Sequence, residues 1–222
     1  MHKTVAEFAD AGLVVEPHLC DLSSDQAVSD LGARISAAHG AIDVVFNNAY
    51  IPMLGTVEKI NIEDWRRAFD VNVLGYVRIV KAFVDPMIAR KSGHFVFTAS
   101  PMGIVPPVAV GGNMMPYIVS KAADIGLAQA MAIGLRQHGI GVSLFFPAIT
   151  NTWSETPPGD VSSEFLVGME QFIRTGMTPE QAAELLLSGL EGGDFCIAAS
   201  DQMRPALEQA GRNGFDPFAF VP

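Results

Sequence analysis

Hydrophobic and polar residues follow two different periods along this chain. Short apolar runs rich in β-branched residues predict strands, and longer segments with apolar residues every three or four positions predict helices. The expected strands cover residues 13–22, 42–46, 94–99, 141–146 and 194–198, and the expected helices cover residues 24–39, 62–90, 116–138 and 178–191. Because strands alternate with helices, the pattern predicts an α/β fold with a parallel sheet and helices on both of its faces.

Two of the expected helices have clear start signals. Ser23 or Ser24 is placed to cap the helix over 24–39. Thr178 precedes Pro179, and Gln181 follows three residues after the cap, which is the pattern of a capped helix with proline at its first position. The stretch between residue 146 and the helix over 178–191 predicts mostly loops, and the residues after 198 predict a polar tail.

Composition adds limits to this picture. The chain has 222 residues, 49% of them hydrophobic and 17% charged, so we expect one domain over 1–222 with a substantial core. The net charge of −10 disfavours a nucleic-acid groove or an anionic membrane surface. No apolar run approaches the ~18 residues of a membrane span, and the first residues form no signal core. We therefore expect a cytoplasmic protein that binds neither nucleic acid nor membrane.

The cysteines and histidines exclude two further classes. Two cysteines, Cys20 and Cys196, are too few for a disulfide scaffold or a Cys-rich zinc site. The five histidines do not fall at metal-ligand spacing. We expect no metal site.

Tyr117 and Lys121 are the first candidates for chemistry. A spacing of four places both side chains on one face of a helix, at about 5–6 Å. An ammonium about 4 Å from a phenol, at an effective dielectric of ~20, favours the phenolate by on the order of 4 kcal/mol, which lowers the phenol pKa by roughly three units. Such a tyrosine can exchange a proton with an alcohol. Taken alone, the pair could also be a surface tyrosine near a solvated lysine.

Further polar residues stand at the ends of apolar segments or inside one. Ser100 follows the strand over 94–99, at the carboxyl edge where open α/β sheets hold ligands. Asn47 and Asn48 end the strand over 42–46 in the same way, and Asn72 interrupts an apolar helix. Each residue has a structural alternative: a turn serine, strand-ending asparagines, and a core amide with satisfied hydrogen bonds.

Together these residues make the sequence resemble the short-chain dehydrogenase/reductase family over nearly the whole chain. The matches fall on the family's adenine-contacting segment, its Asn-Asn-Ala-Gly motif, its catalytic tetrad and its nicotinamide-carboxamide turn: Cys20, Asp21 and Leu22; Asn47, Asn48 and Ala49; Asn72, Ser100, Tyr117 and Lys121; and Pro147, Ala148, Ile149, Thr150, Asn151 and Thr152. The segment over 177–200 resembles the family's closing helix and strand. The resemblance implies a doubly wound, Rossmann-like sheet.

The resemblance also implies an activity, namely hydride transfer between a nicotinamide cofactor and a carbonyl or secondary alcohol. Tyr117 would be the general acid/base, Lys121 would lower its pKa and bind the nicotinamide ribose, Ser100 would donate a hydrogen bond to the substrate oxygen, and Asn72 would hold a water of the proton relay. The implied cofactor is NAD or NADP, and its binding residues would be Asp21, Leu22, Asn48, Ala49, Tyr117, Lys121, Pro147, Ala148, Ile149, Thr150 and Thr152.

The sequence departs from the family at its front. Family members begin with a strand, a Gly-rich turn and a helix that receives the pyrophosphate, whereas none of the 21 glycines here forms such a turn after a strand. The expected fold is therefore N-terminally truncated, without the first two strands. Losing two or three charge-assisted hydrogen bonds of ~1.5–3 kcal/mol each would weaken a micromolar dinucleotide to millimolar or worse. Tyr50 and Ala148 also replace family glycines.

The missing strands leave two possible positions for the strand over 13–22. It can move beside the strand over 42–46, so that Val15 pairs with Val44 as in an ordinary right-handed βαβ unit. Otherwise it stays at the far edge, and the sheet keeps an open groove with unpaired edges.

Residues about 153–176 occupy the position of the family's substrate loop. Methionines and aromatic residues in and around it would suit a small, apolar ketone or alcohol, although they could equally cover the core: Trp153, Phe165, Leu166, Met169 and Phe172, with Met102 and Met114 beside the tetrad. The helix over 116–138 is apolar almost all round, so together with the helix over 62–90 it predicts a homodimer or homotetramer.

Two functions remain open from the sequence. The tetrad favours an NAD(P)-dependent oxidoreductase. The absent Gly-rich turn favours an N-truncated, non-catalytic relative that acts as an oligomerising or binding protein with weak or no cofactor binding.

Overall fold

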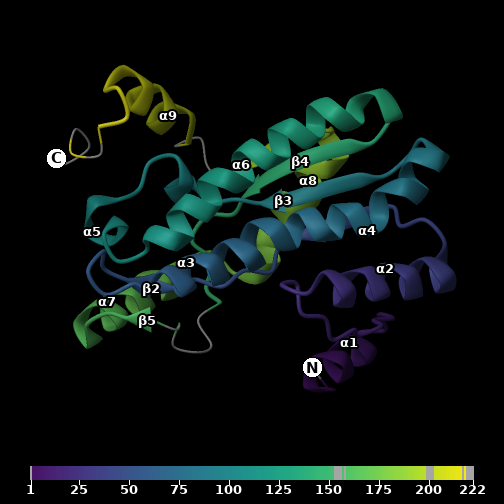
Figure 1. Cartoon of the computed structure of the whole chain (residues 1–222), viewed down its shortest axis with the longest axis horizontal. Coiled ribbons are helices and arrows are strands. Elements are labelled where there is room, and N and C mark those ends of the chain that lie inside the picture. Colours follow the sequence, from purple (N-terminus) through teal and green to yellow (C-terminus); the bar gives the residue numbers. More distant parts are fainter. Residues whose placement is uncertain (1, 153–156, 158, 199–202, 217, 219–222) are drawn as a thin grey trace.

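A four-stranded parallel sheet forms the centre of the molecule (Figure 1). This structure is a computed structural model that describes residues 2–152, 157, 159–198, 203–216 and 218. The strands are β1 (Val44–Asn47), β3 (His94–Thr98), β4 (Gly141–Phe146) and β6 (Cys196–Ala198), in the order β1-β3-β4-β6. The register pairs Asn47 with Phe97 and Thr98 with Phe145, so the carboxyl ends of these strands meet at one edge.

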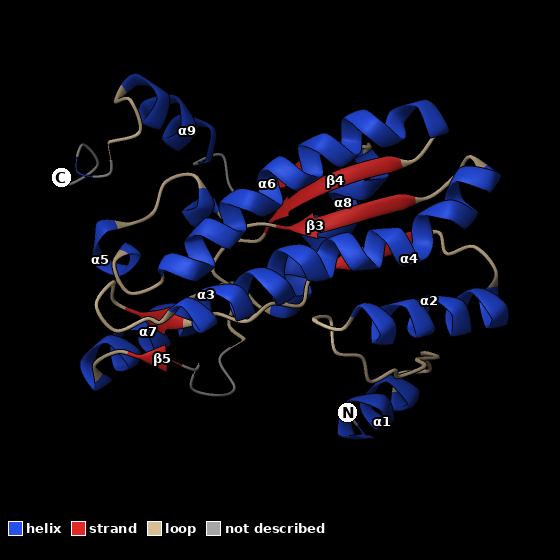
Figure 2. Ribbon diagram, in the orientation of Figure 1, coloured by secondary structure: helices blue, strands red, loops and turns tan. Residues whose placement is uncertain are grey.

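Helices cover both faces of this sheet (Figure 2). On one face, α4 (Gly75–Arg90) and α6 (Met115–Leu135) close the larger core, which includes Phe95 and Phe97. On the other face, α8 (Pro179–Gly192) packs over Val96 and Phe145. The expected α/β fold, a Rossmann-like parallel sheet between two helical layers, is confirmed.

The helix starts follow the signals in the sequence. In α2 (Asp25–His39), which packs beside α4, the Ser24 hydroxyl accepts a hydrogen bond from the Ala27 amide at 3.2 Å. In α8, Thr178 and Gln181 exchange hydrogen bonds as a complete capping box. Both caps satisfy backbone donors that a helix leaves free in its first turn. Local chemistry therefore sets these two boundaries.

The expected helix over 62–90 is one continuous helical rod in three parts. It runs through α3 (Ile62–Phe69), a wider π-helical segment η1 (Asp70–Leu74) and α4. The widened turn carries Asn72, whose side chain is fully buried. Single π-helical turns inside α-helices often occur at functional sites. Here the widening places an amide inside an otherwise apolar interface.

The prediction of a strand over residues 13–22 is wrong. Residues 13–20 have no regular structure and run along the surface, where the Leu19 side chain is 88% exposed. The pairing of Val15 with Val44 is absent, since β1 pairs only with β3 among the described residues. A short apolar run forms a strand only where a neighbouring strand offers a surface and a ladder to pair with. The second edge of β1 is therefore open, and Val44 and Phe46 are exposed along it.

Other elements lie where the sequence predicts none. They include α1 (His2–Asp10), α5 (Val108–Gly111) and the paired short strands β2 (Leu54–Gly55) and β5 (Gly159–Asp160). Two helices also replace expected irregular segments: α7 (Ser163–Arg174) lies in the loop-rich stretch, and α9 (Met203–Arg212) lies in the polar tail. The single turn η2 (Pro101–Gly103) is also unexpected, whereas η3 (Arg136–His138) is the last turn of the expected helix over 116–138.

The segment Met115–His138, which comprises α6 and η3, is long and apolar enough to cross a bilayer by length and composition. This corrects the expectation that no apolar segment approaches that length. The same helix packs on β3 and β4 and carries a buried ion pair between Lys121 and Asp124. Because a core helix passes the same test, this is weak evidence for a membrane span.

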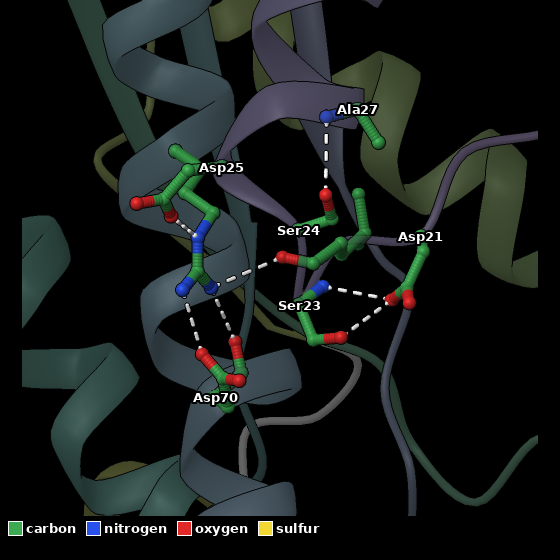
Figure 3. Close-up of polar contacts among 8 residues, drawn as sticks. Asp21, Ser23, Ser24, Asp25, Ala27 and Asp70 are labelled. Carbon is green, nitrogen blue, oxygen red and sulfur yellow. Dashed lines mark hydrogen bonds and ion pairs between the residues drawn. The ribbon is translucent and has the colours of Figure 1, made fainter.

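One arginine connects the irregular N-terminal segment to the helical rod, and Figure 3 labels Asp25 and Asp70, the two carboxylates with which it pairs. Arg78 of α4 donates to the backbone carbonyls of Leu22 at 3.1 Å and Asp70 at 2.9 Å. It also pairs with the carboxylates of Asp25 and Asp70. In the same turn, Asp21 accepts from the Ser23 amide and hydroxyl. These contacts hold residues 21–25 against the start of α4.

Arg78→Ala should lower the free energy of unfolding by about 1–3 kcal/mol, because it removes several charge-assisted hydrogen bonds from a half-buried position. Urea unfolding measures this loss. Lys81→Ala, a similar truncation at an exposed site of the same helix, is the control and should change stability much less. Equal stability of the two variants would contradict the role given to Arg78.

Candidate active site

The candidate site lies at the carboxyl edge of the sheet, where polar residues follow three adjacent strands. Asn47 ends β1, Ser100 lies two residues beyond β3, and Pro147 follows β4. Open α/β sheets bind ligands at this edge because neighbouring connections diverge there. The first turns of α6 pack against the same edge and bring Tyr117 and Lys121 to it.

Tyr117 and Ser100 are neighbours. The Ser100 side chain is close enough to lower the pKa of Tyr117, and the Ser100 oxygen accepts from the Met102 amide at 3.2 Å. This closeness depends on Gly103, because a Cβ at that position would lie 2.6 Å from the Ala122 backbone nitrogen. Only glycine lets the turn after Ser100 approach the α6 backbone so closely.

Lys121 points into the protein interior. Its Nζ donates to the Thr98 carbonyl at 2.7 Å and to the Asp124 carboxylate at 3.0 Å, and the two charged side chains are 1% and 0% exposed. The ammonium also lies 5.4 Å from the ring centroids of both Tyr50 and Tyr76. Asp124 is a residue of this site that the sequence motifs did not predict. An acidic residue inside an apolar helix, one turn after the lysine, was the available signal.

All three tyrosines of the chain gather at this point. The Tyr50 and Tyr117 rings are 5.5 Å apart between centroids, and the Tyr76 ring packs against Phe97 of β3. The Tyr76 hydroxyl has no hydrogen-bond partner among the described residues. Two of the phenol rings therefore face the buried ammonium, and the third, Tyr117, packs against Tyr50.

The pKa of Tyr117 is shifted in the direction opposite to that expected. Burial raises the pKa of Tyr117, the hydrogen bond from Ser100 opposes this rise, and Tyr50 and the Asp124 carboxylate add to it. The expected lowering assumed an unpaired ammonium beside the phenol. In the structure, Asp124 offsets the charge of Lys121 within the same helix.

Asn72 clamps the loop after β1 to α6. Its Oδ1 accepts from the Ile51 amide at 2.8 Å, and its Nδ2 donates to the Ile51 carbonyl and to the Ser120 hydroxyl, both at 3.0 Å. The Ser120 hydroxyl in turn donates to the Tyr117 carbonyl at 2.8 Å. Asn72 is thus a satisfied core amide, and it connects the loop that carries Tyr50 to the turn that carries Tyr117.

The Asn-Asn-Ala segment separates into a buried and an exposed part. Asn47 is buried, and its side-chain amide has no hydrogen-bond partner among the described residues. Asn48 accepts from the Thr98 hydroxyl at 3.1 Å, which links the ends of β1 and β3, while Asn48 and Ala49 face solvent. The exposed pair can therefore contact a ligand that lies across the edge.

The segment of Asp21 and Leu22 comes to the same end of the molecule. Leu22 packs against Gly75 at the start of α4, where a Cβ on the glycine would lie 3.1 Å from the Leu22 Cβ. Asp21 uses one carboxylate oxygen for the turn with Ser23. The structure thus brings this segment beside η1 although it forms no strand.

The turn after β4 is held by the segment before α8. The Asn151 amide donates to the Met177 carbonyl at 2.9 Å, and the Met177 amide donates to the Ile149 carbonyl at 2.8 Å. The Thr150 hydroxyl donates to the Ala148 carbonyl at 3.0 Å, and Thr152 is exposed. These residues form one ordered turn at the carboxyl edge.

An apolar cluster packs beside Tyr117. Leu54, Met114 and Met169 form its buried centre, and Met102, Phe165, Leu166 and Tyr117 pack against it with Val110, Ile118, Val161 and Ile173. Most residues expected to line the substrate loop therefore meet at one place. Phe172 is half exposed and lies outside this cluster, and Trp153 lies outside the described residues.

The sheet, its two helical layers and the polar carboxyl edge define a Rossmann-like α/β protein. The family model described as short chain dehydrogenase matches residues 1–158, so the chain belongs to the short-chain dehydrogenase family, a family of oxidoreductases.

Individual relatives agree with this assignment. The chain is 30% identical to the (2S)-[(R)-hydroxy(phenyl)methyl]succinyl-CoA dehydrogenase subunit BbsD of Thauera aromatica, over 83% of this chain and 72% of that protein. A short-chain dehydrogenase/reductase from Burkholderia phymatum in complex with NAD shares the fold, with a TM-score of 0.81 at 24% identity over 96% of this chain and 80% of that one. A metagenomic short-chain oxidoreductase in complex with NADP is 30% identical, with a TM-score of 0.60 over 78% of this chain and 73% of that one.

Lys121→Met should lower the free energy of unfolding by about 3–5 kcal/mol, because it leaves the buried Asp124 carboxylate without its counter-charge. The double variant Lys121→Met/Asp124→Leu should recover most of that loss, since an apolar pair of similar volume can replace a buried ion pair. Urea unfolding at neutral pH compares the two. If the double variant is as unstable as the single one, the pair does not carry the energy assigned to it.

Proposed function

We propose that this protein is a nicotinamide-dependent oxidoreductase that transfers a hydride between the cofactor and a carbonyl or secondary alcohol. The observation that carries the proposal is that Tyr117 and Ser100 lie together beside the buried Lys121 at the carboxyl edge of the sheet. Membership of the short-chain dehydrogenase family supports it.

In this proposal Tyr117 is the general acid/base. Its hydroxyl would give a proton to, or take one from, the oxygen of the substrate. Ser100 would donate a hydrogen bond to the same oxygen as charge develops there. Lys121 would present its remaining N–H to the nicotinamide ribose, because two of its three donors already bind Thr98 and Asp124.

Asn72 would act by positioning. Both ends of its amide are engaged by Ile51 and Ser120, so its side chain fixes the segment after β1 against α6. The expected relay water would have to share these contacts. We therefore assign Asn72 the placement of the Tyr50 loop and of the Tyr117 turn.

The residues at the edge fit the nicotinamide half of a dinucleotide. The buried ammonium, the phenol and the ordered turn offer donors and carbonyls for ribose hydroxyls and a carboxamide. Its binding residues would be those expected from the sequence, namely Asp21, Leu22, Asn48, Ala49, Tyr117, Lys121, Pro147, Ala148, Ile149, Thr150 and Thr152. Related structures contain NAD in one case and NADP in another, which supports a nicotinamide cofactor of either kind.

The pyrophosphate half has no comparable cradle in the described part of the chain. The second edge of β1 is open, and no Gly-rich turn precedes a helix there. We therefore infer that the 222-residue chain binds the dinucleotide weakly. The same open edge favours a second candidate function, a non-catalytic protein that associates through this surface. Saturable, micromolar binding of NADH or NADPH, followed by fluorescence, would contradict the weak binding.

We propose a small, apolar substrate. The methionine and phenylalanine side chains beside Tyr117 would cover its apolar part. The relative from Thauera aromatica, whose name includes a hydroxy(phenyl)methyl group, supports an alcohol next to an aromatic ring.

Tyr117→Phe should reduce turnover by about 10²–10⁴-fold, because it removes the proton donor and keeps the ring. The assay follows NAD(P)H absorbance with aryl ketones and secondary aryl alcohols at saturating cofactor. Cofactor binding, measured by fluorescence, should remain largely intact. Tyr50→Phe, the same change on the adjacent ring, should reduce turnover far less. Equal losses in the two variants would contradict the assignment of Tyr117.

We also propose that the chain is a cytoplasmic homodimer or homotetramer that associates through α4 and α6. Exposed apolar side chains on the rod and on α6 support this, among them Leu74, Val119 and Ile133, which is 81% exposed. Light scattering coupled to size exclusion at micromolar protein should give twice or four times the mass of one chain. A monomeric mass would contradict the proposal.

A further inference from the structure

Asp124 is a buried carboxylate to which the proposed reaction assigns no role. It lies one turn after Lys121 in α6, and its side chain is fully buried. One oxygen accepts from the Lys121 ammonium at 3.0 Å, and the other has no hydrogen-bond partner among the described residues. A carboxylate in this state is costly, so its presence beside the lysine requires a physical reason.

The reason lies in the burial of the ammonium. A lysine that is 1% exposed loses its hydration, and burial lowers the pKa of Lys121. The Thr98 carbonyl and the faces of Tyr50 and Tyr76 supply only partial negative charge. Asp124 supplies a full charge, which raises the pKa of Lys121 again.

We propose that Asp124 is a positioning residue of the active site, the counter-ion that keeps Lys121 protonated and directs its Nζ between the Thr98 carbonyl and the tyrosine rings. With two N–H groups held in this way, the ammonium has one donor left for a ligand at the carboxyl edge. That ligand is the nicotinamide ribose if the proposed function is correct, so the kinetic part of this inference rests on the proposed function.

The ionisable groups around the ammonium come from three elements. Tyr50 lies in the loop after β1, Tyr76 lies in α4, and Tyr117 and Asp124 lie in α6, while β3 contributes the uncharged Thr98 carbonyl. Burial raises the pKa of Asp124 to about 6, and Lys121 opposes that rise. Above that pH the carboxylate is charged and holds the ammonium, and below it Lys121 loses its counter-ion.

The test is a titration of the lysine side chains by ¹³Cε NMR in the full chain, with Lys121→Met to assign the resonance. Asp124→Asn, which removes the charge and keeps the shape, should lower the midpoint of Lys121 by one pH unit or more. Asp124→Glu should restore most of it. Asp85→Asn, the same change at an exposed site of α4, should leave it unchanged. An unchanged midpoint in Asp124→Asn would overturn the proposal.

A measurement on the unaltered protein keeps the test decisive if Asp124→Asn does not fold. The Lys121 ¹³Cε resonance should move with a midpoint near the pKa of about 6 at which Asp124 gains its proton. A resonance that stays constant through that range would also overturn the proposal.

Kinetics separates this inference from the proposed function. In Asp124→Asn the alkaline limb of kcat/KM for the cofactor should move to lower pH, with the larger change in KM. If no variant turns over any substrate while the NMR midpoint still shifts, the proposed function fails and the role of Asp124 stands. If turnover is normal and the limb does not move, Asp124 does not position Lys121.

Discussion

The burial of one ammonium group organises the candidate site. Lys121 is inside the protein, and its charge is acceptable there only because the Thr98 carbonyl and the Asp124 carboxylate receive its hydrogen bonds. Thr98 belongs to β3 and Asp124 to α6, so satisfying the ammonium also sets how α6 is rotated on the sheet. That rotation directs Tyr117, one turn earlier in the helix, toward Ser100.

Close backbone approaches maintain this arrangement. Gly103 allows the turn after Ser100 to touch α6 beside Lys121, and Asn72 uses a widened helical turn to reach the backbone of Ile51. Ser120 accepts a hydrogen bond from Asn72 and donates one to the Tyr117 carbonyl. Gly103 and Asn72 each act on an element other than their own, and Ser120 acts within α6. Their combined effect is to hold a phenol, a hydroxyl and an ammonium together at the carboxyl edge.

The carboxyl edge of the sheet is more fully hydrogen-bonded at β3 and β4 than at β1. From β3 to β4 the strands are paired on both sides, and the turns that follow them are ordered by hydrogen bonds. At β1 the outer edge is open, and Asn47 keeps a buried amide without a partner among the described residues. In the proposed function, the paired strands and their ordered turns would serve the nicotinamide half of a dinucleotide, and the described residues at β1 offer less for its remainder. The chain belongs to the short-chain dehydrogenase family, and this asymmetry distinguishes its two candidate functions.

The sequence by itself determined the alternation of strands and helices, a cap at Ser23 or Ser24, the cap at Thr178, and the helical spacing of Tyr117 and Lys121. These features depend on residues within a few positions of one another, which is why periodicity and capping chemistry predict them. The tertiary structure alone decided that residues 13–22 form no strand, because a strand needs a partner supplied by distant residues. It also decided the electrostatics of the site. Lys121 and Asp124 are close in sequence, but they are buried only because α6 packs on the sheet. This burial makes the pairing of their charges necessary, and burial also raises the pKa of Tyr117.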